Sequence, residues 1–482
     1  MKAYFNLYRP RMVKVLSYML QSMEYDPIQY LRWFWHQRDF GRLKSKLIKP
    51  TTKSRLLEVL CGLLYLSLVS YGAWLWYSWA ISPEAPALIL AIGVTALLPI
   101  LLAHLLIAPL FVGTWLVQRP IEWLGQRGTK RIFADSSAKV IVIAGSYGKT
   151  SMKHLIKSVL GAKLKVAVTP GNYNTPAGIG RFARKLDGDE DVLVVEAGEY
   201  RPGDVAKICR LAGPDIGFIT GVNEQHMTRM KSVDNALRSA FELAESLAEG
   251  APLYINAESE YLVDQIAKTD LAYSREGVGK LKVSKLSTGL GGTKLTIKPA
   301  KGKSYQLTTS LIGLHQAGPI AAVCYLAADM GLKPADIKKG VKSHEAFSRR
   351  FNPQDINGVT LIDDSYNGNP DGFLAGIDFL DELSRTKRRV YVTPGMTELG
   401  WLTRDVHFAI GQRLAKSKIK LVILNENPAT KQIAAGLEDG KYKGDINWLG
   451  ELDNFLEHVE DLTKPGDVVL MQNSPREAFF YL

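Results

Sequence analysis

Hydrophobic positions near the start of the chain form two long uninterrupted runs. The first spans Leu56–Ile81 and contains one charged residue, Glu58, whereas the second spans Leu88–Val117 and contains none. About 20 apolar residues suffice to cross a bilayer as a helix, and both runs are longer than that. The short link Ser82–Pro86 separates them. The pattern therefore predicts an N-terminal hairpin of two transmembrane helices, at about 56–81 and 88–117. A buried helical hairpin of a soluble protein is the alternative.

Charges and aromatic side chains around these runs indicate an orientation. Residues 1–55 carry 12 Lys and Arg against 3 acidic residues, and the link between the runs carries neither Lys nor Arg. Because basic loops stay on the cytoplasmic side, both flanks are expected in the cytoplasm, in a multi-pass protein of the cell membrane. The aromatic and basic stretch Tyr30–Arg38 is typical of a helix lying on anionic lipid. RNA could bind the same residue types, but the neighbouring spans favour a lipid bilayer as the partner.

From Lys139 onwards, short β-branched runs alternate with amphipathic helical stretches, which indicates α/β domains with mostly parallel sheets. The first series of expected strands is Val140–Ala144, Val192–Val195, Ile216–Thr220 and Leu253–Ile255, and the second is Val359–Ile362, Val390–Thr393, Leu421–Leu424 and Val468–Met471. Helices are expected at Lys149–Leu160, Ala236–Leu247 and His315–Met330, and a small antiparallel insert over 280–312. We therefore expect a membrane module (1–135), a P-loop-type central domain (136–335) and a Rossmann-like C-terminal domain (345–482).

The net charge of +12 does not indicate nucleic-acid binding once it is divided along the chain. Residues 1–135 hold 16 basic and 7 acidic residues (+9), which leaves 44 basic and 41 acidic residues (+3) for residues 136–482. The excess therefore belongs to the membrane module, and no nucleic-acid partner is expected. The three cysteines, Cys61, Cys209 and Cys324, are too far apart in the sequence to indicate a disulfide framework or a zinc site.

The stretch Ile141–Ser151 reads as a strand, a glycine turn and a helix start. Gly145 and Gly148 allow backbone N–H groups to approach phosphate oxygens at the positive end of the helix. Lys149 would reach the β- and γ-phosphates, and the Thr150 hydroxyl would bind Mg²⁺. The first glycine of the usual phosphate-loop pattern is replaced by Ile143. A nucleoside triphosphate is nevertheless the expected ligand.

Two further side chains follow neighbouring strands. Glu196 ends the strand at Val192–Val195, and His226 follows the strand at Ile216–Thr220, after Asn223. Open α/β sheets bind ligands beyond the carboxyl ends of their strands, so both are expected at the phosphate site. A carboxylate and an imidazole there suit a divalent cation. The predicted metal ligands are therefore Thr150, Glu196 and His226.

With these motifs assembled, the chain resembles the ATP-dependent Mur ligase family, most closely the branch that adds D-alanyl-D-alanine. The stretch Gly145–Ser151 is similar to the family's ATP loop, and Gly171-Asn-Tyr-Asn-Thr to its Asn-rich loop. Asp363-Asp-Ser-Tyr-Asn-Gly-Asn-Pro370 is similar to the signature of that branch, whose residues face the nucleotide. The resemblance implies that ATP contacts Gly145, Ser146, Tyr147, Gly148, Lys149, Thr150, Ser151, Asn174, His315, Arg350, Asp364, Asn367 and Asn369.

The chain departs from the family pattern at three places. Ala240 stands where the family carries a lysine that is commonly carbamylated and bridges magnesium, and Pro319 stands where it carries an asparagine near adenine. The membrane hairpin stands where the family has the domain that binds a UDP-sugar. The resemblance therefore implies the chemistry more firmly than it implies the substrate.

The activity implied by the resemblance is amide-bond formation. ATP, with Mg²⁺, would phosphorylate a carboxylate, and an amine would then displace phosphate; Lys149, Glu196 and His226 are the expected catalytic residues. The substrates would be a muramoyl-peptide and an amino acid or dipeptide such as D-Ala-D-Ala. A ligase for a lipid-linked precursor and a catalytically weak nucleotide-binding scaffold at the membrane are the alternatives.

Overall fold

The computed structural model describes residues 11–23, 25, 27–36, 51–108, 119–268, 271–345, 349–366, 368–383, 388–450, 459 and 461–473. Two compact units make up the chain, Met1–Leu124 and Gly125–Leu482. Helix α7 (Arg119–Asp135) contains the division between them.

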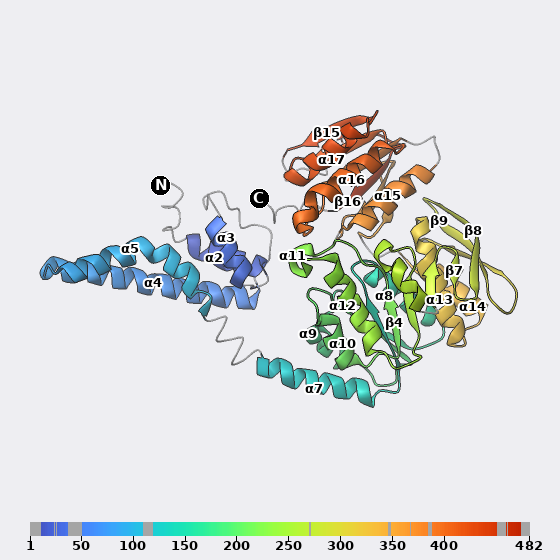
Figure 1. Ribbon diagram of the computed structural model, residues 1–482, viewed down its shortest axis with the longest axis horizontal. Coiled ribbons are helices and arrows are strands. Elements are labelled where there is room, and N and C mark those ends of the chain that lie inside the picture. Colours follow the sequence, from blue (N-terminus) through green and yellow to red (C-terminus); the bar gives the residue numbers. More distant parts are fainter. Residues whose placement is uncertain are drawn as a thin grey trace. The chain divides into compact units, whose positions relative to one another are not determined.

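The first unit is helical, and two of its helices form the predicted hairpin (Figure 1). Helix α4 (Thr52–Ile81) agrees with the expected first run, and Trp76 Nε1 on it donates to Thr95 Oγ1 of α5 at 3.0 Å. Helix α5 (Ala85–Leu105) ends earlier than expected, since residues 106–107 form a turn, and residues 109–117 lie outside the described residues. Both helices are long and apolar enough to cross a membrane by length and composition.

Two short amphipathic helices, α2 (Arg11–Ser22) and α3 (Pro27–His36), pack on the hairpin through a small apolar core. Helix α3 covers most of the aromatic stretch predicted to lie on lipid. Its Tyr30 and Phe34 are buried in that core, whereas Trp35 is 61% exposed. The part of the stretch in α3 is therefore helical, with Tyr30 and Phe34 packed inward and Trp35 facing outward.

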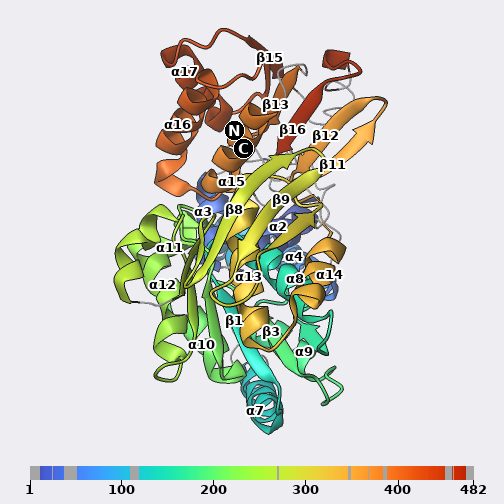
Figure 2. The same cartoon turned by 90° about the vertical axis from the view of Figure 1, so that its right-hand side faces the viewer.

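The central domain is built on a ten-stranded sheet in the order β10-β9-β8-β7-β6-β5-β4-β1-β3-β2 (Figure 2). The parallel part consists of β1 (Lys139–Ala144), β2 (Val166–Val168), β3 (Val192–Glu196), β4 (Ile216–Ile219), β5 (Leu253–Asn256) and β6 (Leu271–Ser274). The antiparallel part consists of β7 (Gly277–Val278), β8 (Leu281–Gly289), β9 (Gly292–Lys298) and β10 (Tyr305–Thr309). The strands predicted here are confirmed. The predicted antiparallel strands are confirmed as well, and they continue the same sheet.

Strand β1 shows why these sequences read as continuous apolar runs. Val140 and Val142 enter one hydrophobic core, and Ile141 and Ile143 enter another, because successive side chains point to opposite faces of the sheet. Helices cover both faces, so every residue of β1 after Lys139 is buried. Helices α8 (Lys149–Leu160), α13 (Ala317–Asp329) and α14 (Pro334–Ser343) contribute to one core, and α9 (Pro176–Ala183), α10 (Asp204–Ala212), α11 (Met227–Met230) and α12 (Val233–Ser246) to the other.

The C-terminal domain has a second sheet, in the order β11-β12-β16-β13-β14-β15. Its strands are β11 (Asn352–Ile356), β12 (Val359–Asp364), β13 (Arg389–Thr393), β14 (Leu421–Asn425), β15 (Asp445–Leu449) and β16 (Val468–Gln472), of which β11 alone is antiparallel to its neighbour in the described sheet. Helices α15 (Pro370–Glu382), α16 (Thr403–Ala415) and α17 (Pro428–Asp439) pack with it (Figure 1). The four strands predicted in this domain are confirmed.

Candidate functional site

The pairing of three parallel strands brings the phosphate loop and its neighbours to one edge of the central sheet. Strand β1 lies between β3 and β4, with Ile143 opposite Glu196 and Ala144 opposite Ile219. All three strands therefore end at the same level. The loop that begins at Gly145, the Glu196 carboxylate and the loop beyond Ile219 meet there, as the sequence predicted.

The phosphate loop is held closely against the end of β4. Ser146 N donates to Gly221 O at 2.7 Å, and the Thr220 hydroxyl donates to Tyr147 O. A Cβ on Gly145 would lie 2.5 Å from Thr220 Oγ1, so the close approach requires glycine there. Gly148, with φ +78°, turns the chain into α8. The backbone thus presents the start of α8 to the site, as an anion-binding loop does.

Lys149 and Thr150, the first residues of α8, have different partners. The Lys149 ammonium folds back over the loop, donating to Gly145 O and, at 3.4 Å, to Ser146 O. The Thr150 hydroxyl donates to Glu196 Oε2 at 3.1 Å. Two of the three predicted metal ligands are therefore in contact, and both offer oxygen atoms, which Mg²⁺ prefers.

Glu196 is buried, and both of its oxygens have partners. Lys153 Nζ lies 2.8 Å from Oε2, with both side chains almost completely excluded from solvent. Asn174 Nδ2 reaches Oε1 at 3.5 Å. Lys153 also donates to Gly171 O at 2.7 Å, and so attaches the Asn-rich loop to the phosphate site. Lys153 was not predicted from the sequence, although it lies one helical turn beyond Lys149 on the same face of α8.

His226, the third predicted metal ligand, contacts the C-terminal domain, and its role as a metal ligand stays a prediction. The structure pairs its Nδ1 with Glu398 Oε2 of the C-terminal domain and places Tyr200 with its ring centroid 5.8 Å away. Burial alone would raise the pKa of Glu398, but the hydrogen bond from His226 and the charges of His226 and Arg229 hold it below its usual value. The imidazole therefore connects the central and C-terminal domains.

A cavity of about 350 Å³ lies between the central and C-terminal domains, beside the phosphate loop. Seven of the predicted nucleotide-contacting residues line it: Tyr147, Gly148, Ser151, His315, Arg350, Asp364 and Asn369. Pro319 lines it as well, at the position where the resemblance expects an asparagine near adenine. Asn367 lies outside the described residues. Residues far apart in the sequence thus share one cavity.

Burial sets the protonation of two groups that line this cavity. It lowers the pKa of His315 to about 4, so the imidazole is neutral near pH 7. Burial also raises the pKa of Asp364 to about 6, against hydrogen bonds from Gln472 and from the Phe351 amide. Arg350 is stacked over the Tyr366 ring at 4.6 Å. The cavity therefore combines aromatic surface with a few fixed polar groups, as small-molecule sites do.

Asn223 connects the two walls of the site. Its Nδ2 donates to Asn369 Oδ1 at 3.0 Å and to Asp371 Oδ2 at 2.7 Å. Asn369 caps α15 by accepting from the Gly372 amide at 3.0 Å. The signature segment of the C-terminal domain is thus positioned by a residue that follows β4 of the central domain.

Comparisons with known proteins agree with this architecture. The chain matches the Mur ligase middle domain over residues 143–327 and the Mur ligase glutamate ligase domain over residues 349–474. The chain belongs to the Mur ligase family. It is 25% identical over 350 residues to the UDP-N-acetylmuramoyl-tripeptide–D-alanyl-D-alanine ligase of Bacillus subtilis, covering 72% of this chain and 76% of that one. The corresponding Synechocystis ligase is 26% identical over 376 residues, covering 74% and 79%.

Solved structures share the fold. A MurF structure from Acinetobacter baumannii superposes with a TM-score of 0.65 at 20% identity, covering 74% of this chain and 78% of that one. The MurF ligase of Thermotoga maritima in complex with ADP gives 0.64 at 23% identity, covering 74% and 82%. The mixed α/β architecture with mostly parallel sheets is therefore that of a Mur ligase.

Ala240 is completely buried in α12, among the apolar side chains of one face of the central sheet. An alanine offers no group that could be carbamylated or bind a cation. Any compensation for the family lysine has to come from another element.

Lys153→Met should destabilise the second unit by about 3–5 kcal/mol, because it leaves the Glu196 carboxylate buried without its ammonium partner. Urea unfolding followed by circular dichroism measures the effect, and the double variant Lys153→Met/Glu196→Gln should recover most of the loss. Lys165→Met, which removes an exposed ion pair with Asp187, is the control and should have a much smaller effect. Equal unfolding of Lys153→Met and the wild type would show that the pair does not stabilise the fold.

Asp364→Asn should remove a pH-dependent loss of stability. The pKa of Asp364 in the folded chain, about 6, lies above its ordinary 3.8, so folding favours the protonated form. That contribution is complete below about pH 4 and is lost as the pH rises through about 6, amounting to about 3 kcal/mol. The unfolding free energy of the variant relative to the wild type should therefore grow by about this amount between pH 4 and pH 7. A pH-independent difference, or equal growth in the exposed control Asp355→Asn, would contradict the assignment.

Proposed function

We propose that the chain is an ATP-dependent ligase that joins a carboxylate to an amine in cell-wall precursor synthesis. The observation that carries the proposal is the cavity between the phosphate loop and the Asp363–Pro370 segment, which is lined by residues of both domains. The relatives at 25–26% identity are named as ligases that add D-alanyl-D-alanine to a UDP-N-acetylmuramoyl-tripeptide. A muramoyl-peptide and D-Ala-D-Ala are accordingly the first substrates to test.

The residues of the site have distinct tasks in this reaction. The loop amides and Lys149 hold the phosphates, once the ammonium exchanges its carbonyl partners for phosphate oxygens. Thr150 and Glu196 would hold Mg²⁺, which reduces the charge on the transferring phosphoryl group. Neutral His315 and the stacked Arg350 line the adjoining cavity, where the rest of the nucleotide would lie.

The chemistry proceeds in two steps. A carboxylate oxygen of the acceptor attacks the γ-phosphorus, the bond to the β-bridging oxygen breaks, and ADP leaves an acyl phosphate behind. The amine then adds to the acyl carbon, and the tetrahedral intermediate expels inorganic phosphate as the amine loses a proton. Catalysis of phosphoryl transfer is mostly positioning and electrostatic stabilisation, which suits a site built from fixed loops and buried charges.

Phosphate release should be observed when the chain is given ATP, Mg²⁺, D-Ala-D-Ala and a muramoyl-tripeptide. Lys149→Ala should lower kcat by at least about 100-fold, because the transferring phosphoryl group loses its main counterion. Lys157→Ala, on the same helix but outside the cavity, should retain near-normal turnover. Normal turnover by Lys149→Ala would refute the loop assignment. Nucleotide binding without turnover of any amine, unchanged by Ala240→Lys, would indicate a scaffold in place of a ligase.

We also propose that the first unit anchors the ligase in the cell membrane, with both flanks cytoplasmic. Many large apolar side chains of α4 and α5 are exposed, including Leu63 at 57%, Leu66 at 60% and Ile89 at 71%. Exposed surface of this kind is unfavourable in water and favourable in lipid. An anchored active site favours an acceptor at the bilayer, so a lipid-linked precursor is the second candidate substrate.

Cysteine labelling tests the orientation. In intact cells, a membrane-impermeant maleimide should label Ser82→Cys in the link between α4 and α5. It should label the matched control Ser136→Cys, just beyond α7, after permeabilisation of the membrane and not before. Recovery of the protein in the soluble fraction, or labelling of Ser136→Cys in intact cells, would contradict the anchor. Comparing phosphate release with a UDP-linked and with a lipid-linked acceptor distinguishes the two candidate substrates.

A further inference from the structure

Glu199 is a buried carboxylate at the phosphate loop to which the predicted site gives no task. It lies three residues beyond Glu196, past the end of β3, and is 5% exposed. Its Oε1 accepts the backbone N–H of Gly145, the first residue of the loop. Its Oε2 is buried and has no hydrogen-bond partner among the described residues. A buried carboxylate oxygen without a hydrogen-bond partner lowers the stability of the fold, so the unpartnered Oε2 needs a physical explanation.

The surroundings of Glu199 place it among the groups that handle phosphate. Burial raises the pKa of Glu199, while the charges of Lys149 and His226 and the Gly145 amide oppose that rise. Glu242, the nearby carboxylate, has a structural task, since it accepts from the Gly203 and Ala206 amides at the start of α10. Glu199 differs from Glu242, because only its Oε1 accepts an amide and its Oε2 has no hydrogen-bond partner among the described residues.

A triphosphate bound in the loop would meet this carboxylate directly. The phosphates need the loop amides and the Lys149 ammonium, and Glu199 already contacts the Gly145 amide and lies close to Lys149. Two anions in a buried site repel strongly. Three arrangements relieve the repulsion: a proton on Glu199, movement of its side chain away from the loop, or a cation between the carboxylate and the phosphate.

We propose that Glu199 is a ligand of a divalent cation that binds together with the nucleotide, distinct from the cation at Thr150 and Glu196. The proposal rests on the ligase function above. Glu196 is already shared by Lys153, Thr150 and Asn174, so it has little capacity for a second ion. Glu199 has a free buried oxygen. Mg²⁺ is usually held by one or two carboxylates together with substrate phosphates, so the site is completed when the nucleotide arrives.

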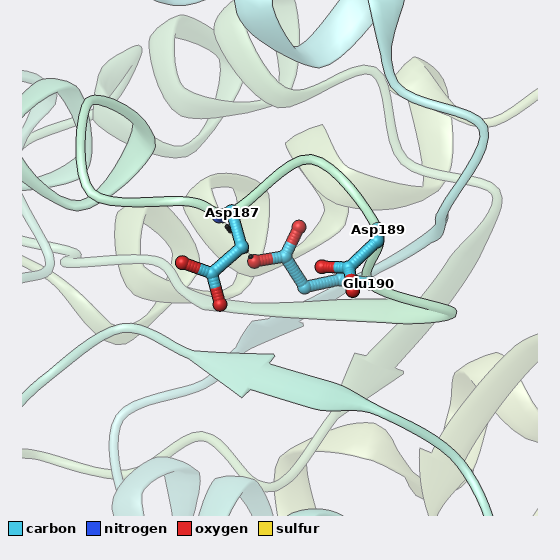
Figure 3. A group of neighbouring side chains, drawn as sticks. All are labelled: Asp187, Asp189 and Glu190. Carbon is cyan, nitrogen blue, oxygen red and sulfur yellow. Dashed lines mark hydrogen bonds between the residues drawn. The ribbon is translucent and has the colours of Figure 1, made fainter.

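The described residues also contain a cluster of three acidic side chains, which provides a matched control. Asp187, Asp189 and Glu190 have ligand atoms within 4.8 Å of one another, a spacing that no other group of His, Cys, Asp or Glu reaches in this part of the chain (Figure 3). Each carboxylate of that cluster already has a partner within the chain. Lys165 Nζ pairs with Asp187 and Asp189, and the amides of residues 187 and 188 donate to Glu190. Asp187 and Asp189 are also 71% and 70% exposed, so solvent screens the charge that Lys165 does not balance.

The test counts ions on the full chain in detergent with a non-hydrolysable ATP analogue, using Mn²⁺ titration followed by electron paramagnetic resonance. The wild type and the control Asp187→Asn should each bind about two Mn²⁺ ions. Glu199→Gln should bind about one, or bind the second at least about tenfold more weakly. Without divalent ions, Glu199→Gln should bind the analogue more tightly than the wild type, because the repulsive charge is gone while the acceptor for the Gly145 amide remains.

Equal Mn²⁺ stoichiometry and affinity in Glu199→Gln and the wild type would overturn the proposal, as would a single ion in the wild type. If Glu199→Gln does not fold, Glu199→Asp keeps the charge and should bind the second ion with reduced affinity; unchanged affinity there would also overturn it. The outcomes of the Mn²⁺ titration can be distinguished from those of the ligase assay. A wild type that binds the analogue with two ions but joins no substrates would refute the ligase function and leave the cation site standing.

Discussion

The parallel pairing of β1 with β3 and β4 is the constraint on which the rest of the site depends. Parallel strands in register end together, so the turn after β1, the residue that ends β3 and the loop after β4 must meet at one edge. Both faces of β1 are buried in hydrophobic cores, which fixes its register, since a slip of one residue would exchange the two cores. The phosphate loop is therefore positioned by the packing of β1, the strand that precedes it.

That edge gathers charges, and the chain balances them internally. Glu196 meets Lys153 with both side chains excluded from water, and Glu199 lies close to Lys149. Buried ions persist when they are paired, because removing one partner leaves the other desolvated. The Gly145 amide and the Lys149 ammonium are thus bonded to the protein's own groups. In the proposed reaction, nucleotide and cations would replace these contacts.

Much of this could be predicted from the sequence, because periodicity and strand ends are local properties. The strands of both domains, the start of α8 at Lys149 and the position of Glu196 beside Thr150 follow from such patterns. The partner of His226 does not, since Glu398 is 172 residues away and belongs to the other domain. Lys153 and Glu199 were missed for a related reason: a charged residue on a helix or in a loop reads as solvated, and burial is visible only after packing. The continuity of the antiparallel strands with the central sheet is likewise a tertiary property.

The distribution of charge differs between the two parts of the chain. Of the +12 net charge, +9 belongs to residues 1–135 and +3 to residues 136–482. A nearly balanced catalytic part does not attract a polyanion over a long range, so it must hold its nucleotide by short-range contacts at the loop. Such contacts are sensitive to nearby carboxylates, which is why we expect a buried group such as Glu199 to affect phosphate binding. The basic excess, in contrast, lies in residues 1–135, which include the exposed apolar helices α4 and α5 and whose proposed partner is an anionic lipid surface.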